Sequence, residues 1–176
     1  MPSPELALLE ARLAQASSVE EIARAIIAVG RRMIGCDGIT FVINENGFCH
    51  YLDEDAISPL WKGNKYPAAH CISGWVMSNR RATMIPNIFQ DERIPHDVYR
   101  RTFVKSLEMV PVGDRGAAAI GSYWAEFHDP TEHESTALHI LARAAAAALE
   151  RLESVTCPPP YPHDRDQGAF RLGQRP

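Results

Sequence analysis

The chain has 176 residues, of which 45% are hydrophobic and 23% are charged, and its formal net charge is −4 at pH 7. This composition predicts one globular domain with a packed core, and the weak net charge excludes a general attraction to nucleic acid or to an anionic membrane. No apolar stretch reaches the roughly 18 residues that a membrane-spanning helix needs. The N-terminal sequence MPSPELALLE lacks the basic and apolar regions of a secretion signal, so we expect a cytoplasmic protein.

Two amphipathic helices are predicted at the N-terminal end. The first carries one apolar stripe with three- and four-residue spacing, made by Leu6, Leu9, Leu13 and Ala16. An S-x-x-E capping box at Ser18 and Glu21 begins the second helix, which ends near Gly35. A small domain with helices on a sheet does not need the first stripe for its own core, so we expect this stripe to contribute to a homodimer.

Runs of β-branched and aromatic residues predict the strands. Residues 39–43 and 48–52 flank the turn sequence NENG and predict a hairpin. Residues 106–112 and 117–125, joined by GDRG, predict a second hairpin, and residues 82–86 predict a short additional strand.

A long closing helix is predicted after the second hairpin. Asp129 can cap it, Pro130 suits its first position and Glu132 completes a D-x-x-E box. The apolar stripe that follows consists of Leu138, Leu141, Ala145, Ala148 and Leu152. Beyond it the sequence is Pro-rich and aperiodic, so we expect one domain over residues 1–156 and a disordered tail over 157–176.

These elements predict an α+β fold with a central antiparallel sheet. The N- and C-terminal helices should cover one face. Residues 53–104 are too long and too aromatic for a bare linker, so we expect this loop- and helix-rich segment to cover a pocket on the other face.

Three stretches between residues 51 and 125 carry a family resemblance: YLDEDAISPLWKGNKYP, CISGWVMSNRRATMIPNIFQDERIPHDVYRRTFVKSLEMVPV and AAIGSYWA. With the order of the elements, they resemble the GAF domain found ahead of bacterial sensor histidine kinases, over about residues 18–153. The resemblance implies a small-molecule pocket and terminal helices that dimerise and signal to a kinase or another partner. It leaves the ligand and any cofactor open, and the chain is either a free-standing GAF protein or a fragment.

Aromatic side chains are the candidate walls of this pocket, because ligand sites are mostly apolar. We expect Trp61, Trp75 and Tyr123 to serve as walls. Tyr123 and Trp124 are neighbours on a strand and point to opposite faces. We assign Tyr123 to the pocket and Trp124 to the side of the terminal helices.

Polar candidates lie in the segment NIFQDERIPHDVYRRTFVK. Arg93, His96 and Arg100 are the residues expected to meet an anionic group of the ligand, because an arginine fork binds carboxylate or phosphate. A structural alternative has Arg93 pair with Asp91 or Asp97 and merely shape the loop.

The sequence AAHCISGW places Cys71 near the start of a predicted helix, where a thiolate would be stabilised. The sequence shows neither a base nor a neighbouring thiol, since the other cysteines (Cys36, Cys49 and Cys157) are distant along the chain. We therefore expect Cys71 to be a buried residue lining the pocket, while Ser73 caps the helix and Trp75 packs inward. The spacings of histidine and cysteine predict no metal site.

Taken together, the residues and the resemblance predict a non-catalytic sensory domain that binds a small molecule and signals through its terminal helices. An enzymatic alternative is a thiol-dependent GAF-type reductase that uses Cys71. A structural alternative is a dimerisation module without ligand. We expect neither nucleic acid nor a membrane as a partner.

Overall fold

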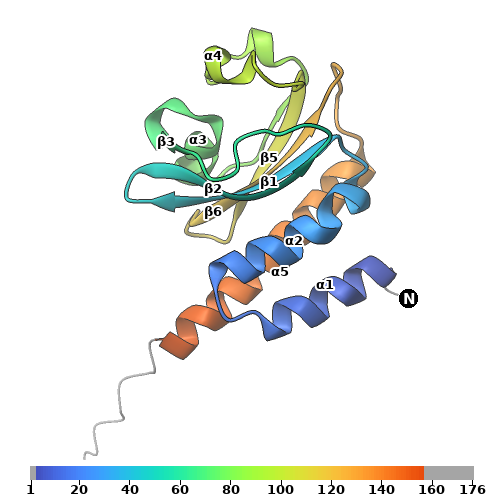
Figure 1. The fold of residues 1–176 in the computed structure, drawn as a ribbon, viewed down its shortest axis with the longest axis vertical. Coiled ribbons are helices and arrows are strands. Elements are labelled where there is room, and N and C mark those ends of the chain that lie inside the picture. Colours follow the sequence, from blue (N-terminus) through green and yellow to red (C-terminus); the bar gives the residue numbers. More distant parts are fainter. Residues whose placement is uncertain (1–2, 157–176) are drawn as a thin grey trace, which may run out of the picture.

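Residues 3–156, which the computed structural model describes, contain a six-stranded antiparallel sheet with helices on both faces (Figure 1). The strands are β1 (Gly38–Glu45), β2 (Phe48–Ala56), β3 (Lys65–Pro67), β4 (Thr83–Ile85), β5 (Ser106–Val112) and β6 (Ala118–Trp124). Their order in the sheet is β3-β2-β1-β6-β5-β4. The predicted tail over 157–176 lies outside the described residues.

The helices form two separate layers. The longer ones are α1 (Pro4–Gln15), α2 (Val19–Ile34) and α5 (Glu132–Thr156), which lie together on one face of the sheet in Figure 1. The other face carries α3 (Ile72–Asn79), α4 (His96–Tyr99) and the 3₁₀ turns η1 (Ala68–His70) and η2 (Ile88–Gln90). This arrangement confirms the predicted α+β class.

Local sequence explains the central hairpin. Asn46 and Gly47 both have positive φ angles, 54° and 84°, which is the backbone of the type I′ turn that joins twisted antiparallel strands. The register shifts between Phe41 and Val42, so β1 and β2 contain a bulge. The strand β3 pairs with β2 opposite Cys49, and its three residues gave no sequence signal.

The helical layer buries the apolar stripe of α1 within the chain's own core. Leu9 is fully buried and Leu13 is 6% exposed, and both pack in one cluster with residues of α2 and α5. Arg151 of α5 also donates hydrogen bonds to the Leu13 and Ala16 carbonyls, at 2.8 and 2.7 Å. The expectation that this stripe is spare for a dimer is therefore wrong, because α1 lacks another apolar face to dock on α2 and α5.

The closing helix begins later than its sequence suggested. Glu132 is the first residue of α5, and the cap is Thr131, whose hydroxyl accepts from the Glu134 backbone N–H at 3.3 Å. The Glu134 carboxylate in turn accepts from the Thr131 backbone N–H at 2.7 Å, which completes a capping box. Asp129 lies outside the helix, so its predicted capping role is wrong.

Candidate functional site

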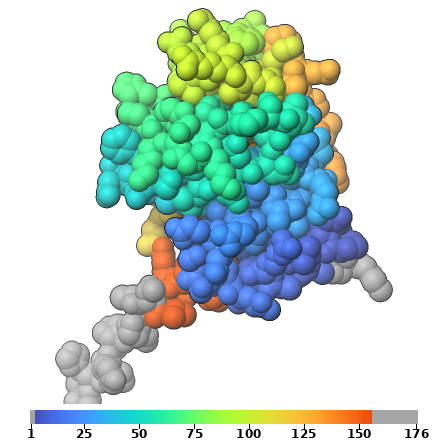
Figure 2. Space-filling view, in the orientation of Figure 1, coloured from blue at the N-terminus to red at the C-terminus, as the bar shows by residue number. Residues whose placement is uncertain are grey.

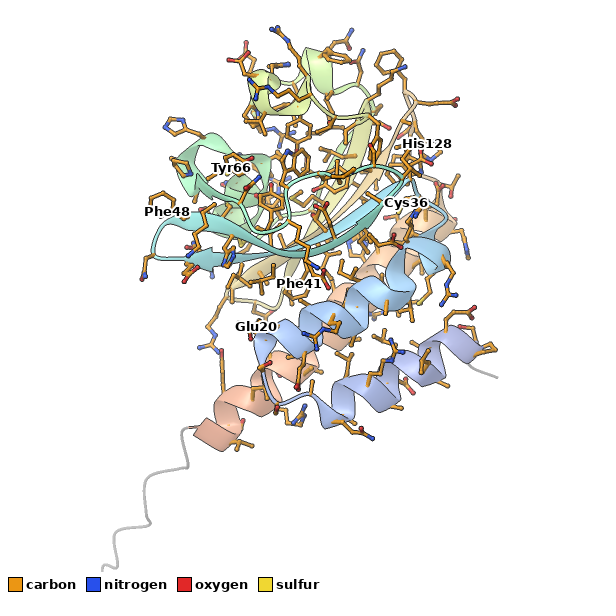
Figure 3. The ribbon with its side chains drawn as sticks, in the orientation of Figure 1. Glu20, Cys36, Phe41, Phe48, Tyr66 and His128 are labelled. Atoms are coloured by element: carbon orange, nitrogen blue, oxygen red, sulfur yellow. The ribbon has the colours of Figure 1, made fainter. Side chains whose placement is uncertain are left out.

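Five aromatic side chains meet between the sheet and the segment that covers its second face. We call Tyr51, Trp61, Tyr66, Tyr99 and Tyr123 the aromatic cluster. Its ring centroids lie 4.7 Å apart for Trp61 and Tyr99, 5.5 Å for Trp61 and Tyr123, and 5.3 Å for Tyr51 and Trp61. Figure 3 shows this layer filled with side chains, with Tyr66 near the edge of the sheet.

Alternation along β6 places Tyr123 in this layer. Tyr123 belongs to the buried cluster on the α3 and α4 side, whereas Trp124 belongs to the cluster under α1, α2 and α5. The two neighbouring aromatic residues therefore face the two sides that the sequence analysis assigned to them.

The hydroxyl groups of the aromatic cluster differ in their partners. The Tyr123 hydroxyl lies 2.9 Å from the Thr40 hydroxyl, and the Tyr51 hydroxyl lies 3.2 Å from the Ser73 hydroxyl. The Tyr99 hydroxyl is buried and has no hydrogen-bond partner among residues 3–156. Burial raises the pKa of Tyr51, Tyr99 and Tyr123 above the ordinary value, so all three are neutral donors at physiological pH.

Trp61 is held in the cluster through its backbone. Both oxygens of the Glu54 carboxylate are used to bind three successive backbone N–H groups: Leu60 at 2.8 Å, Trp61 at 2.7 Å and Lys62 at 2.8 Å. Carboxylate bonds to backbone amides are among the stronger hydrogen bonds in proteins. Glu54 therefore fixes the loop that presents Trp61, a role that the sequence analysis did not identify.

A groove runs along the outer side of the aromatic cluster. Its volume is about 420 Å³, and its lining residues are Pro59, Leu60, Trp61, Asn64, Tyr66, Asp97, Val98, Arg101 and Thr102. It lies between the loop before β3 and the α4 region. In Figure 2 these two regions, blue-green and yellow-green, lie against each other.

A second group of expected site residues lies beyond the aromatic cluster. The Arg93 guanidinium stacks over Trp75 with its carbon 4.4 Å from the ring centroid. It also donates to Asp91, at 2.9 Å from Nε to Oδ1 and 2.6 Å from the terminal nitrogen to Oδ2, and to the Thr83 hydroxyl at 3.0 Å. These bonds hold the pKa of Asp91 below its usual value and raise that of Arg93. Arg93 therefore shapes the loop as the structural alternative described.

The remaining expected residues are placed as follows. His96 Nε2 lies 3.2 Å from the Asp91 carbonyl oxygen, in the same group as Arg93. Arg100 is exposed, and a terminal nitrogen of its guanidinium lies 3.6 Å from the Asp97 Oδ1. Trp75 is half-buried: it packs against the edge of the buried cluster on this face, and Arg93 covers its ring. The structure thus brings Trp61 and Tyr123 together, groups Trp75 with Arg93 and His96, and leaves Arg100 apart.

Cys71 lies in the buried layer and has a thiol neighbour. The Cys49 and Cys71 thiols lie close enough for each to shift the pKa of the other, and Ser73 lowers the pKa of both. The Cys71 thiol donates to the Pro67 carbonyl oxygen at 3.1 Å. Cys49 is fully buried and Cys71 is 6% exposed. The statement that Cys71 has no neighbouring thiol is therefore wrong, because β2 carries Cys49 past the start of α3.

The start of α3 also differs from the expected cap. The helix begins at Ile72, after Cys71, and no side chain caps it. Ser73 lies inside the helix and faces Tyr51 instead. Gly74 lets this turn approach closely, because a Cβ at that position would collide with the Ala68 carbonyl.

Several site residues were missed from the sequence, although one signal was present. In FCHYL the alternation of a strand puts Cys49 and Tyr51 on one face, and both prove to be buried toward α3. Tyr99 and Glu54 gave no such signal, because their partners lie on other elements. Among residues 3–156 there is no group of three or more His, Cys, Asp or Glu side chains placed to hold a metal ion. In the same part of the chain, every helix is too short or too polar to cross a membrane.

Comparisons with known proteins identify the family. The model of the GAF domain matches residues 18–149, so the chain belongs to the GAF domain family. GAF domains are sensory modules that bind small molecules and occur in sensor kinases, and most of them are regulatory rather than catalytic. No curated protein matches the chain.

Solved structures share the fold at low sequence identity. The GAF domain of an Acinetobacter phosphoenolpyruvate-protein phosphotransferase has 13% identity and a TM-score of 0.69, and the match covers 89% of this chain and 99% of that one. The GAF domain of a two-component sensor histidine kinase from Bacillus halodurans has 16% identity and a TM-score of 0.66, with 81% and 100% covered. A free methionine-R-sulfoxide reductase from Neisseria meningitidis, solved with its substrate, has 14% identity and a TM-score of 0.69, with 88% and 96% covered. At these identities the likeness concerns the fold alone.

Proposed function

We propose that the chain is a non-catalytic sensory GAF domain that binds a small molecule between the sheet and residues 61–105. The observation that carries this proposal is the Tyr99 hydroxyl, which is buried in the aromatic cluster without a partner in the described chain. A buried hydroxyl without a hydrogen bond costs free energy. A ligand acceptor atom at this position would remove that cost.

The aromatic cluster and the groove beside it favour one kind of ligand. Trp61 belongs to both: it lines the groove, and its ring centroid lies 4.7 Å from that of Tyr99. The buried hydroxyls are neutral, so they favour an uncharged acceptor such as a carbonyl. We propose a ligand with a flat, largely apolar body and one hydrogen-bond acceptor, with Trp61 and Tyr123 as walls.

The other expected site residues enter the proposal at the rim. Cys71 lines the floor next to Tyr51 and Ser73. Trp75, Arg93 and His96 form a rigid edge, because the Arg93 guanidinium is already paired with Asp91. Arg100 is exposed just after α4 and is available to a charged group only outside the groove.

Signalling is proposed to pass through the terminal helices. The β1 and β6 strands have one face in the aromatic layer and the other under α2 and α5, so a shift of the sheet reaches both helices. A ligand that binds two arrangements with different affinity would shift their populations. We propose a cytoplasmic homodimer that acts on a histidine kinase or another signalling protein of a two-component system.

Native mass spectrometry of the protein purified from its own host tests the ligand proposal. We expect a bound species of small mass that is released on denaturation. Hydrogen exchange should then show residues 61–66 and 96–102 becoming protected when that species is added back to stripped protein. If the native protein carries no ligand and these residues are fully protected without one, the domain is a structural module and the proposal fails.

A further inference from the structure

The strongest feature that the proposed sensory role leaves unused is the pair of thiols at Cys49 and Cys71. The two residues come from different elements, the start of β2 and the residue before α3. They are 22 positions apart in the chain, yet both side chains pack in the same buried cluster. The backbone of β3 brings them together: Cys49 pairs with Tyr66, and the Cys71 sulfur lies 4.0 Å from the Tyr66 carbonyl oxygen and 3.1 Å from the Pro67 carbonyl oxygen. Each thiol also shifts the pKa of the other.

We propose that Cys49 and Cys71 form a redox site in which a small hydroperoxide converts the two thiols to an intramolecular disulfide. A disulfide needs two sulfur atoms at about 2.05 Å and closely spaced Cβ atoms, so only cysteines that already face each other can form one without large backbone movement. Cys49 and Cys71 lie on either side of the Tyr66–Pro67 backbone in one buried cluster, so a small movement of the short strand β3 would bring the two sulfur atoms together. The site is independent of the proposed ligand, since it requires no occupied groove.

The surroundings support one cysteine as the attacking group. The hydrogen bond from Cys71, and a further one from the Ser73 hydroxyl, lower the pKa of Cys49 to about 7 although burial opposes this. The same contact and burial raise the pKa of Cys71. Because the titration belongs to the pair, one proton leaves readily and the second is retained. Thiolate is the reactive form of cysteine, so the pair presents one nucleophile and one resolving thiol.

The chemistry balances with hydrogen peroxide as the oxidant. The Cys49 thiolate attacks one peroxide oxygen and the O–O bond breaks, which leaves a sulfenic acid on Cys49 and hydroxide that takes up the proton lost by Cys49. The Cys71 sulfur then attacks the Cys49 sulfur. An S–S bond replaces the S–O bond, and the departing hydroxide takes the Cys71 proton. Two thiols and one peroxide thus give one disulfide and two water molecules.

Access for a molecule of this size comes from the edge of the sheet. β3 is an edge strand of three residues, and the η1 turn that follows it has Ala69 and His70 exposed. This thin cover separates the thiols from solvent. Short edge segments open locally at low free-energy cost, and a peroxide is close to water in size.

The decisive experiment uses the wild-type protein, reduced and then exposed to hydrogen peroxide. Free thiols are alkylated, and non-reducing peptide mapping locates the linkages. We expect a Cys49–Cys71 linkage within one chain, loss of two alkylation sites and recovery of both with dithiothreitol. Cys36 is the internal control, because burial raises its pKa to about 12 and keeps it a thiol. Peroxide should leave it unoxidised, so it should still be alkylated once the protein is unfolded.

Two variants assign the roles within the pair. In Cys71→Ser, the hydroxyl keeps a hydrogen-bond donor beside Cys49 but cannot form a disulfide, so the sulfenic acid on Cys49 should be trapped by dimedone. In Cys49→Ala, Cys71 should remain a thiol under the same exposure. The proposal is overturned if both wild-type thiols stay reduced, if the linkage joins other cysteines or two chains, or if Cys49 proceeds to sulfinic acid without a disulfide.

Discussion

Two buried side chains, Tyr99 and Glu108, each leave an oxygen atom without a hydrogen-bond partner in residues 3–156. They lie on opposite faces of the sheet. Tyr99 belongs to the aromatic layer, and Glu108 of β5 faces the first turns of α5, where its Oε1 accepts from the Ser135 hydroxyl at 2.7 Å. Such groups are rare in folded proteins, and each therefore predicts a measurable effect when it is replaced.

The substitution Tyr99→Phe should stabilise the ligand-free protein by about 1 kcal/mol, because it removes a buried hydroxyl that lacks a partner. The matched control is Tyr123→Phe, which should lower the free energy of unfolding by about 1 kcal/mol because it leaves the Thr40 hydroxyl unpaired. Urea denaturation of the two variants measures both changes. Equal destabilisation by both variants would show that Tyr99 has a partner in the free protein, and it would remove the main support for the ligand proposal.

The buried carboxyl group of Glu108 should make the free energy of unfolding depend on pH, and the direction of this dependence follows from its pKa. Burial raises its pKa, so the folded protein holds the Glu108 proton more tightly than the unfolded chain does. That contribution to stability is fully present below the pKa of the unfolded chain and is lost as the pH rises through the folded pKa. The charged groups facing it are Glu134, which also raises its pKa, and His139, which lowers it.

Glu108→Gln should therefore be more stable than the wild type at neutral pH, and the difference should shrink as the pH falls. Glutamine keeps an acceptor for Ser135 and carries no charge to bury. Unfolding by urea over a series of pH values measures the difference. Glu134 titrates in both proteins; its pKa is lowered, against burial, by hydrogen bonds from Thr131 and His128, and its contribution cancels in the comparison. A difference that stays constant with pH would contradict the buried-carboxyl interpretation.

At the scale of elements, local sequence predicted most of the fold. Residues 106–112 match β5 at both ends, and the NENG turn lies where Asn46 and Gly47 need positive φ angles. Such signals come from residues that are close together in the chain, so they can be recognised in the sequence alone. The start of α5 was misassigned because Asp129 and Thr131 are both good capping residues, and only the path of the chain after β6 decides between them.

Thr131→Ala should lower the free energy of unfolding by about 1 kcal/mol, since it removes the hydroxyl that caps α5. Asp129→Ala, two residues away and outside the helix, should change it by less than about 0.5 kcal/mol. Thermal or urea unfolding of the pair distinguishes the two caps. A larger loss in Asp129→Ala would show that the helix begins where the sequence pattern placed it.

The candidate site was less predictable than the elements. Trp61 and Tyr123 could be chosen as wall residues because large aromatic side chains in a sheet-covering segment tend to be buried. The thiol contact could not be found, because it depends on how β3 and η1 fold back over β2. The sequence left Arg93 open between a ligand contact and a pair with Asp91 or Asp97, and it gave no sign of the Thr83 hydroxyl that also binds the guanidinium.

At the scale of the molecule, the sheet separates two layers of side chains that have different roles. The aromatic layer holds the candidate site, and the helical layer holds the chain's own core together with the surface proposed for dimerisation (Figure 1). Leu9 and Leu13 are buried in this core and so are not available to a second chain. The exposed apolar side chains of this layer are instead Leu8 on α1, 42% exposed, and Val155 near the end of α5, 74% exposed.

The proposed homodimer should therefore depend on Leu8 and Val155 and not on Leu9. The double substitution Leu8→Glu and Val155→Glu should weaken association at least tenfold, about 1.4 kcal/mol, while circular dichroism and the unfolding midpoint of the monomer stay unchanged. Leu9→Glu should unfold the protein instead, because it places a charge in a fully buried position. Sedimentation equilibrium of the three proteins at tens of micromolar separates these outcomes. A monomeric wild type at that concentration would rule out the homodimer, and a folded, monomeric Leu9→Glu variant would show that the α1 stripe does form the interface.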